Sequence, residues 1–535
     1  MIFIYYPLIL LSILGYGFFV SKKIIKVENF NLGYQGIIGI FFLLLISYIS
    51  TQFIAHNQLF NSIILLIGLG LFLFYFDQLN ISKKNIKLLF ILVMLFVIFI
   101  LLGKNHDDFH YYHFPYILTL VEYPHPVGLG HLNHGFKTHS SIFLLSSLLS
   151  LPAAKYNLFH LMPAYIMVFS NFILIKLIFN KNIRKDYIFV TFLSLSSLVF
   201  INIFFYRLGE HGTDRSAMVL IILLLVNCLY FINKKNKNIN VDYLKLFTII
   251  FTIIISLKTL YGIYFILSFP LIIFLYQKEK SINLLFNTTF FCCFLLVGFV
   301  ILTNFFNTGC LLFPEKKTCF FNVSWSLNLD TVEYLSVHYE NWAKAGSGAG
   351  YALKDIDKLN YISDFNWISN WIDKYFFNKV SDLLYSLLFM ALIFIILFKS
   401  SKSLKIYRRN YKSVFFLLSV IFIIWFSLHP ALRYGGYHLF FLIFFIPISF
   451  FLEKFSNNLK NLDRKILVIV VITAFVFVGR NVNRLFNEYK INSYNPLINV
   501  NYPLNEDSFR IQKRIKKMIN EKKAKKIYRN RYIVF

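Results

Sequence analysis

Long apolar segments alternate with short, lysine-rich loops along most of the chain. Each apolar segment has about 14 to 23 residues, and about 20 residues of α-helix cross a hydrocarbon layer of about 30 Å. The pattern therefore predicts an all-α integral membrane protein. It indicates about fourteen transmembrane helices, near residues 2–20, 34–55, 59–76, 88–103, 157–179, 187–205, 216–232, 244–257, 260–276, 284–306, 380–398, 413–428, 437–452 and 466–479.

Clusters of Lys and Arg between these segments predict how the chain is oriented, because basic loops favour the cytoplasmic side of a membrane. If every cluster is cytoplasmic, two crossings separate each consecutive pair and the N-terminus lies outside. The clusters lie at residues 22–26, 83–87, 181–185, 234–237, 278–280, 399–412 and 454–465.

This topology places the polar regions 104–156, 207–215 and 307–379 outside, where we expect the chemistry. Residues 1–480, with the outer loops 104–156 and 307–379, form a polytopic membrane domain, and residues 481–535 form a basic tail. The tail also falls outside, against the charge rule, unless the last helix is miscounted, in which case it lies inside. The two segments around Lys258 are short, so a re-entrant hairpin is an alternative to two crossings.

The composition excludes a soluble globular protein, since 58% of the residues are hydrophobic, 15% are charged and the mean hydropathy is +0.63. The net charge of +29 comes from lysines in the loops between apolar segments. Because these lysines form no basic stripe with base-reading side chains, we expect no nucleic-acid partner. The bilayer is the expected environment.

Two of the five cysteines lie in the third outer region, where an oxidising environment would allow them to pair. Cys310 and Cys319 flank eight residues and are predicted to form a disulfide. The other three lie in apolar segments, where they are expected to pack.

Adjacent carboxylates and many histidines follow the fourth apolar segment. Asp107 and Asp108 are costly to desolvate at a membrane boundary, which indicates a water-filled cavity, a cation or a reaction. Seven of the thirteen histidines lie in residues 106–139. On a helix, His106, His110 and His113 would share one face, so a divalent metal ion held by Asp107, Asp108 and His110, or by the three histidines, is one alternative. A half-wet interfacial belt of His and Tyr is the other.

Several motifs of the chain resemble those of bacterial multi-pass GT-C-like glycosyltransferase-type membrane proteins. The first outer region carries Asp108-x-x-x-Tyr112-His113, then Gly-Leu-Gly-His-Leu-Asn at 128–133 and Ser-Ser-Ile-Phe-Leu-Leu-Ser at 140–146. Thr213-Asp214, Leu257-Lys258-Thr259 and Gly-Cys-Leu-Leu-Phe-Pro at 309–314 are similar to further pieces of the same group. The sequence departs from the group at His131, His134 and Lys137.

This resemblance implies a GT-C-like fold with an outer loop or helical insert. It also implies a glycosyltransferase in the bacterial inner membrane, with its active face periplasmic. The donor would be a sugar on a polyprenyl phosphate, and the acceptor a lipid-linked or cell-surface glycan. Asp108 would be the catalytic base, assisted by Asp107. The side chains expected to bind the substrate and its phosphate are Lys258, Arg215, Asp214, Arg433, His438, Tyr112 and His113.

Simpler roles exist for most of these residues. The aspartates of the first outer region would pair with Lys104 or with an arginine that extends to the membrane interface. Asp214 would pair with its neighbour Arg215, and Lys258 would extend to the interface. Two further function classes stay open. An O-antigen polymerase or ligase would depend on the 307–379 loop and Arg433 but not on Asp108. A lipid-linked sugar transporter or flippase would carry ionisable residues at mid-bilayer.

Overall fold

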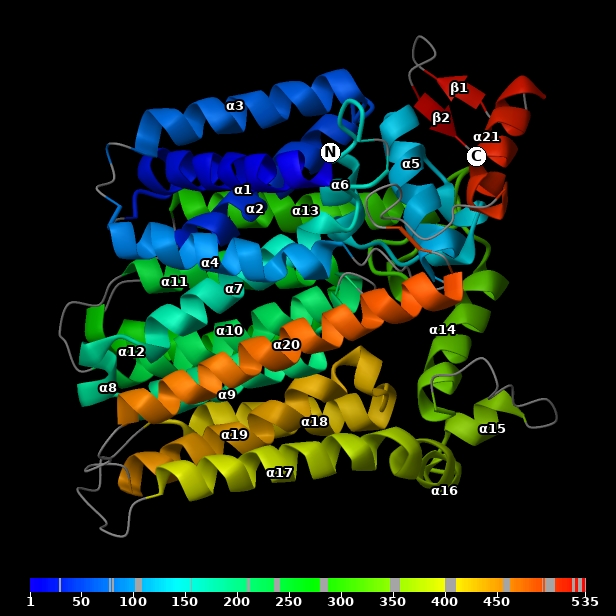
Figure 1. Ribbon diagram of the computed structural model, residues 1–535. Helices are drawn as coiled ribbons and strands as arrows, with labels where there is room; N and C mark the ends of the chain where they lie inside the picture. The colour runs from blue at the N-terminus through cyan, green and yellow to red at the C-terminus, as the bar shows by residue number, and fades with distance from the viewer. Residues whose placement is uncertain are drawn as a thin grey trace.

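The protein is a bundle of long, roughly parallel helices with smaller elements gathered at one end (Figure 1). The computed structural model describes residues 1–27, 30–76, 78, 81–101, 108–154, 156–208, 212–234, 241–279, 287–346, 357–399, 410–455, 462–492, 494–495, 506–521, 525–527 and 532–534.

Each of the fourteen apolar segments contains a helix. The helices of these segments are α1 (Ile2–Phe19), α2 (Leu32–Thr51), α3 (Gln58–Phe76), α4 (Lys83–Ile100), α7 (Leu161–Ile178), α9 (Ile188–Phe204), α10 (Gly212–Asn233), α11 (Val241–Leu257), η7 (Thr259–Leu267) continued by α12 (Ser268–Glu279), α13 (Thr288–Thr308), α17 (Ser381–Phe398), α18 (Lys412–Leu428), α19 (Gly436–Phe455) and α20 (Leu462–Asn492).

Shorter elements connect them. The helices are η1 (Val20–Ile24), η3 (Phe109–His113), α5 (Phe114–Glu122), η4 (Leu129–His131), η5 (His134–Phe136), α6 (Ser141–Ser147), α8 (Lys181–Asp186), η9 (Lys316–Thr318), α14 (Leu329–Lys344), α15 (Lys358–Ile362), α16 (Ile368–Trp371), η10 (Ile372–Val380), η11 (Leu432–Tyr434), η12 (Glu506–Phe509) and α21 (Arg510–Asn520). Strands β1 (Lys525–Ile527) and β2 (Tyr532–Val534) pair in an antiparallel register.

The described residues contain nine helical segments that are long and apolar enough to cross a membrane, so the protein is a multi-pass helical membrane protein. Three shorter apolar helices, Ile188–Phe204, Thr259–Ile273 and Lys412–Leu428, add to them. The nine are Ile2–Ile24, Leu32–Thr51, Gln58–Phe76, Leu161–Ile178, Gly212–Asn233, Thr288–Thr308, Ile368–Phe398, Gly436–Phe455 and Leu462–Ile491.

Glycines allow the first three helices to pack closely. A Cβ atom on Gly15 would lie 2.0 Å from the Gly68 carbonyl oxygen on α3, and one on Gly39 would lie 2.0 Å from the Ile13 carbonyl oxygen on α1. Small residues at such crossings let backbones approach where no hydrophobic force drives helices together. Large apolar side chains such as Leu73 on α3 and Phe475 on α20 are instead exposed, as expected for surfaces that face lipid.

The basic loops gather at one end of the bundle. Helix α8 lies at this end, opposite α5, α14 and α21 (Figure 1). Contacts of basic side chains join the loops to each other and to nearby helix ends: Lys22 Nζ to Gln78 Oε1 at 2.9 Å, Lys245 Nζ to the Ile25 carbonyl at 2.8 Å, Lys176 Nζ to Asn85 Oδ1 at 3.0 Å, Lys465 Nζ to the Leu397 carbonyl at 2.6 Å, and Arg184 with Asp463. We call this the basic end.

The C-terminal tail lies at the opposite end. Helix α20 runs unbroken through the boundary expected at residue 480, and α21 packs on α5, where Gln512 Nε2 donates a 2.8 Å hydrogen bond to the Pro115 carbonyl. The tail therefore shares an end of the bundle with the first outer region, which is the arrangement that the helix count predicts.

The chain on either side of Lys258 forms two helical arms. Helix α11 has 17 residues, and η7 and α12 together have 21. At about 1.5 Å per residue in α-helix and 2.0 Å in 3₁₀-helix, each arm is about 25 Å or longer. The third outer region forms a helical insert made of α14, α15 and α16, in agreement with the expected insert (Figure 1).

Candidate functional site

A cavity of about 410 Å³ opens at the end opposite the basic loops. Its walls come from segments far apart in the sequence: the first outer region, the α11–η7 junction, the third outer region and the turn between α18 and α19. The residues that line it are Asp108, Tyr111, Tyr112, His134, Gly135, Thr138, His139, Lys258, Thr259, Leu260, Phe313, Pro314, His338, Tyr339, Trp342, His429, Arg433 and Tyr434.

Four charged side chains meet at this cavity. Arg433 Nη2 lies 2.7 Å from Asp108 Oδ2, and Arg433 Nε lies 3.1 Å from Asp214 Oδ2. Lys258 Nζ lies 2.9 Å from Asp214 Oδ1. Asp214 is only 5% exposed, whereas Arg433 is 40% exposed, so the carboxylate is enclosed and the guanidinium faces the cavity. We call these four residues the charged cluster.

Local backbone structure explains these positions. Lys258 adopts an extended conformation between α11 and η7, so its side chain leaves the bundle at a helix break. Arg433 lies in η11, just before Gly435, whose φ of 122° needs a residue without a Cβ. Asp214 lies in the first turn of α10, where the helix dipole favours a negative charge. A helix junction, a turn and the start of a helix thus bring three charged side chains together.

The charged cluster is electrically balanced, with two carboxylates and two cations. Burial lowers the pKa of the Arg433 guanidinium, but Asp214, Tyr112 and Asp108 raise it more, so that it lies well above its ordinary value. Burial raises the pKa of the Tyr112 hydroxyl, and Asp108 raises it further. Tyr112 is therefore a neutral hydrogen-bonding group beside a permanent cation.

Three histidines of the cavity stay neutral near pH 7. Burial is the main cause that lowers the pKa of His134, of His338 and of His429, and neighbouring lysines add to it. Glu340 opposes the shift at His429, but the pKa of His429 still lies below its ordinary value. A neutral imidazole accepts a proton or a hydrogen bond, which suits a cavity that binds hydroxyl groups. Lys258 also lies 5.5 Å from the centre of the Tyr434 ring.

Sequence reasoning did not assign a role to the aromatic wall from α14. His338, Tyr339 and Trp342 line the cavity from this helix. The His338 ring centre lies 6.0 Å from that of His134, which joins the third outer region to the first. Tyr339 and His338 precede Trp342 by three and four residues, and this spacing, which places side chains on one face of a helix, was the available signal.

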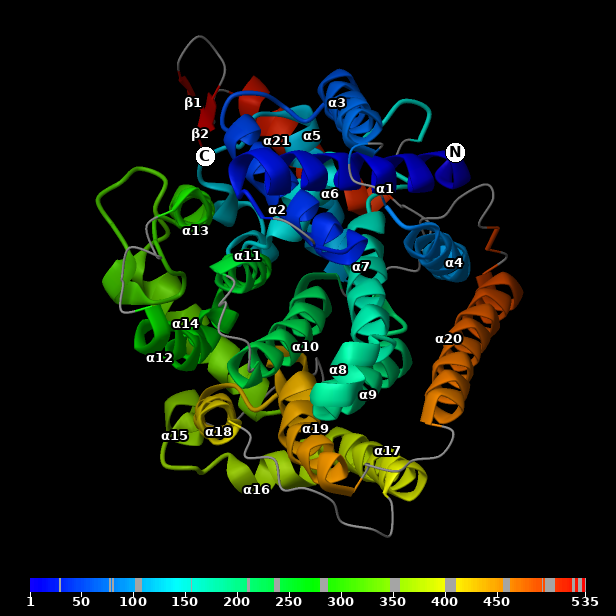
Figure 2. The same ribbon diagram turned by 90° about the vertical axis from the view of Figure 1, so that its left-hand side faces the viewer.

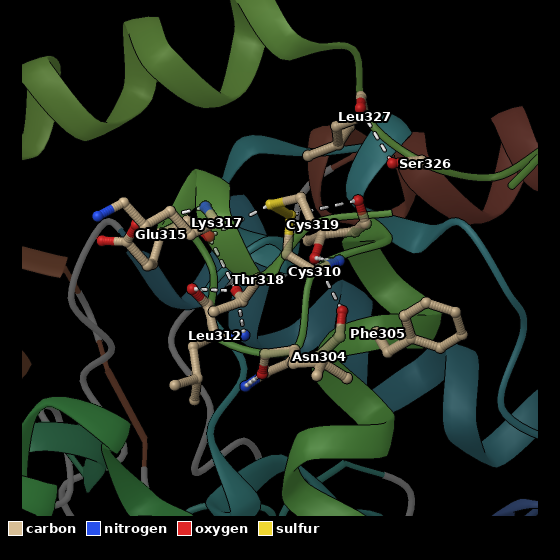
Figure 3. The surroundings of a disulfide bond; sticks show 12 residues. Asn304, Phe305, Cys310, Leu312, Glu315, Lys317, Thr318, Cys319, Ser326 and Leu327 are labelled. Carbon is tan, nitrogen blue, oxygen red and sulfur yellow. Dashed lines mark hydrogen bonds between the residues drawn. A yellow bond between two sulfur atoms is a disulfide. The ribbon is translucent and has the colours of Figure 1, made fainter. Parts of the chain in front are cut away.

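The predicted disulfide supports the same wall. Cys310 and Cys319 are bonded, and the loop that they close follows the end of α13 (Figure 3). Phe313 and Pro314 lie inside this loop and line the cavity. The cross-link therefore holds part of the cavity wall in a small, constrained loop.

Several predicted site residues lie elsewhere. His438 is fully buried and bonded to the Tyr264 hydroxyl, between α19 and η7. Arg215 packs against the rings of Phe205 and Tyr437, with distances of 5.9 and 6.0 Å to the ring centres. Arg215 follows Asp214 by one residue, about 100° around α10, and so faces away from the cavity.

His113 and His110 do not join the charged cluster either. The His113 ring packs 5.0 Å from the Phe143 ring, in a small separate pocket. His110 Nδ1 bonds to Ser508 Oγ at 2.9 Å, in the C-terminal tail. The η3 segment is a π-helix, so these two histidines do not follow the α-helical spacing used to align them.

Asp107, His106 and Lys104 lie outside the described residues, so the expected roles of these three are not described. One simpler role agrees with the structure, because Asp108 pairs with an arginine, Arg433. Two are wrong: Asp214 pairs with Lys258 and Arg433 and not with Arg215, and Lys258 does not merely extend to the interface. Gly435 and Gly436 do form the turn between two helices.

Asp108 and His110, the two described ligands of the predicted metal site, have other partners. Asp108 and Asp214 each bind a cationic side chain, and His110 is directed to Ser508. Among the described residues, no group of three His, Cys, Asp or Glu side chains is arranged to hold a metal ion.

Residues 1–441 match the family described as "Domain of unknown function (DUF8201)". The chain belongs to this family. The match covers the charged cluster, the disulfide loop and α14, so the cavity lies wholly within the DUF8201 region. No curated protein and no solved structure matches the chain.

Proposed function

We propose that this DUF8201 protein is a GT-C-like membrane glycosyltransferase that moves a sugar from a polyprenyl-phosphate-linked donor to a lipid-linked or cell-surface glycan acceptor. The observation that carries the proposal is the meeting of Asp108, Asp214, Lys258 and Arg433, from four distant segments, at one cavity lined by aromatic rings. Aromatic and imidazole side chains provide flat surfaces and polar tips, which suit sugar rings and their hydroxyls.

The proposed reaction is a single displacement. The acceptor hydroxyl oxygen forms a bond to the anomeric carbon, and the bond from that carbon to the donor phosphate oxygen breaks. The electron pair of the broken bond stays on the phosphate, and Asp108 accepts the hydroxyl proton. The configuration of the anomeric carbon inverts because bond formation and bond cleavage occur on opposite faces.

The two cations of the charged cluster would stabilise the leaving phosphate. Arg433 uses Nε and Nη2 on the carboxylates, and a guanidinium has five N–H groups, so further donors face the cavity. Asp214 holds Arg433 and Lys258 together before substrate arrives. Such preorganisation lets fixed charges stabilise developing negative charge without reorganisation.

The proposed topology has about fourteen crossings in a bacterial inner membrane, with the cavity on the periplasmic side. The gathering of basic loops at the end opposite the cavity supports this orientation, because basic loops favour the cytoplasm. The disulfide at the cavity end supports it as well, since disulfides persist in oxidising compartments.

Purified protein in nanodiscs, given a polyprenyl-phosphate sugar with a radiolabelled sugar and a membrane glycolipid extract as acceptor, tests the proposal. Asp108→Asn keeps the size of the side chain but removes the base, and we expect transfer to fall by about a hundredfold or more. Asp330→Asn, an exposed carboxylate on α14, is the matched control and should transfer at the wild-type rate. Full transfer by Asp108→Asn would reject the base assignment.

An O-antigen polymerase or ligase is the second candidate, and the α14 wall of the cavity favours it. That function depends on the third outer region and on Arg433 but not on Asp108. Its signature would be glycan polymerisation or ligation in a strain that carries Asp108→Asn, together with loss of activity in Arg433→Lys. A lipid-linked sugar transporter is less favoured, since the charged cluster lies at one end of the bundle.

A further inference from the structure

A second, larger hollow lies outside the candidate site, between α9, α17 and α20. It has a volume of about 950 Å³, and its walls are mainly apolar, with side chains such as Ile203, Met390, Phe394, Val468 and Ile472. Figure 2 looks along the helices and places these three helices on the same side of the molecule. We call this hollow the apolar groove.

Cationic side chains lie at both ends of the apolar groove. Arg464 and Lys465 line it at the basic end, and Arg480 lines it at the other. Arg464 and Arg480 are sixteen residues apart on α20, which corresponds to about 24 Å of helix. The groove is therefore nearly as long as a bilayer's hydrocarbon layer, which is about 30 Å thick.

The mouth of the groove near the cavity holds arginines against aromatic rings. The Arg480 guanidinium lies 3.7 Å from the centre of the Tyr206 ring, and its Nη1 donates a 2.7 Å hydrogen bond to the Ile203 carbonyl. Arg215 packs against Tyr437, a residue that also lines the groove. We call Arg215, Arg480, Tyr206 and Tyr437 the groove mouth.

The charge of the groove mouth is positive. Arg207 lies within electrostatic range of both Arg215 and Arg484, and Glu488 is the acidic group that acts on Arg484. Asp214 acts on Arg215 from the charged cluster, so three or more guanidinium groups have two carboxylates near them. The remaining positive charge attracts an anion, and a planar guanidinium binds phosphate oxygens in pairs.

A short run of contacts joins the groove mouth to the charged cluster. Tyr437 contacts Arg215, Arg215 is bonded along the chain to Asp214, and Asp214 binds Arg433. The groove mouth is therefore linked to the charged cluster through Arg215 and Asp214, although the Arg215 side chain itself faces away from the cavity. A lipid that only fills space between helices does not require contacts between the groove mouth and the charged cluster.

We propose that the apolar groove binds the hydrocarbon chain of a single-chain prenyl phosphate, with the phosphate held by Arg480 and Arg215 at the groove mouth. This inference rests on the proposed function, because that lipid phosphate is the donor or the leaving group of the proposed transfer. It assigns Arg215 a place in binding the lipid phosphate, outside the charged cluster.

Photo-crosslinking tests this inference without transfer. A radiolabelled prenyl monophosphate with a diazirine in its chain is added to the full-length protein in nanodiscs, and crosslinked peptides are identified by mass spectrometry. We expect crosslinks on α9, α17 and α20. Arg480→Gln and Arg215→Gln should each weaken binding about tenfold, as expected for loss of a charge-assisted hydrogen bond.

Two matched pairs of variants control the experiment. Ile472→Trp fills the groove and should abolish crosslinking, whereas Phe475→Trp, on the same helix but outside the groove lining, should leave it unchanged. Arg510→Gln, an exposed arginine of α21, should also leave binding unchanged. Asp330→Asn, an exposed carboxylate of α14, should bind the probe normally as well.

Two results would overturn the inference: unchanged binding in the Arg480→Gln and Ile472→Trp variants, or equal displacement of the probe by phosphatidylglycerol, which would mean that the groove takes bulk lipid. Binding as predicted in a protein that transfers no sugar would instead contradict the proposed function alone.

Discussion

Two groups of cations lie at the same end of the bundle but are held in different ways. In the charged cluster, Arg433 and Lys258 bind carboxylates, and the charges cancel. At the groove mouth, Arg215 and Arg480 pack on aromatic rings. A ring orients a guanidinium without neutralising it. The comparison indicates that the charged cluster fixes the positions of its side chains, whereas the role proposed for the groove mouth is to attract an anion.

The largest expected difference between the two groups concerns Asp214. Asp214→Asn leaves Arg433 and Lys258 side by side without their shared enclosed carboxylate, and removing one partner of a buried ion pair costs about 3 to 5 kcal/mol. We expect a loss of this size in the free energy of unfolding, measured by chemical unfolding in detergent micelles. Asp330→Asn should change it by less than about 0.5 kcal/mol. An equal free energy of unfolding for the two variants would mean that the charged cluster does not stabilise the fold.

A double-mutant cycle sharpens this result. Removing Lys258 together with Asp214, as Lys258→Gln in the Asp214→Asn background, removes one of the two unpaired cations. We expect the double variant to be more stable than the sum of the single variants by about 2 kcal/mol. Lys317→Gln, an exposed lysine of the disulfide loop, should be additive with Asp214→Asn. If the effects of Lys258→Gln and Asp214→Asn were also additive, this result would contradict the ion pair between Lys258 and Asp214.

Acid should affect the cavity but not the apolar groove. Burial lowers the pKa of His139, which lines the cavity and bonds to Tyr48 at 2.8 Å, to about 3. The folded protein then disfavours the charged imidazole, so its contribution is complete above the unfolded pKa of about 6.5 and is lost as the pH falls towards 3. Between pH 6.5 and 5 the expected loss is about 2 kcal/mol.

The measurement is the free energy of unfolding across this pH range for the wild type and for His139→Gln. The variant should show a flatter profile by about that amount. Among the described residues that line the groove there is no histidine, so binding of the prenyl monophosphate probe should lack this component. If the free energy of unfolding depended on pH in the same way in the wild type and the variant, His139 would not be the cause of the pH dependence.

The smallest expected effect on stability is at the groove mouth. Arg215→Gln removes a partly exposed cation that packs on two rings, and we expect the free energy of unfolding to change by less than about 1 kcal/mol. The same variant should lose about tenfold in probe binding. A large loss of stability would show instead that Arg215 supports the fold.

The positions of the long helices could be predicted from the sequence, because each apolar segment carries its own requirement for burial in lipid. The meeting of Asp108, Asp214, Lys258 and Arg433 could be anticipated as well. Each of these residues lies at the end of an apolar segment on the same side of the predicted topology, and helix ends on one side share a narrow layer. Counting the predicted membrane crossings places all four residues on one side, and this count needs no information on how the helices pack.

The direction of single side chains could not be predicted in this way. Arg215 and His438 lie at the expected ends of their apolar segments, yet Arg215 packs on the rings of Phe205 and Tyr437, and His438 is bonded to Tyr264. One residue along a helix turns a side chain by about 100°, and depth alone does not fix that angle. The α14 wall of the cavity was missed for a related reason, since the docking of a polar helix depends on contacts with His134 and its neighbours.

The most direct test of sugar transfer is a comparison of membrane glycolipids, by mass spectrometry, in cells with and without the gene. We expect deletion to remove one glycan product and to accumulate its prenyl-phosphate sugar donor. Wild-type protein and Asp330→Asn should restore the product, and Asp108→Asn should not. Unchanged glycolipids after deletion, or full restoration by Asp108→Asn, would contradict the account.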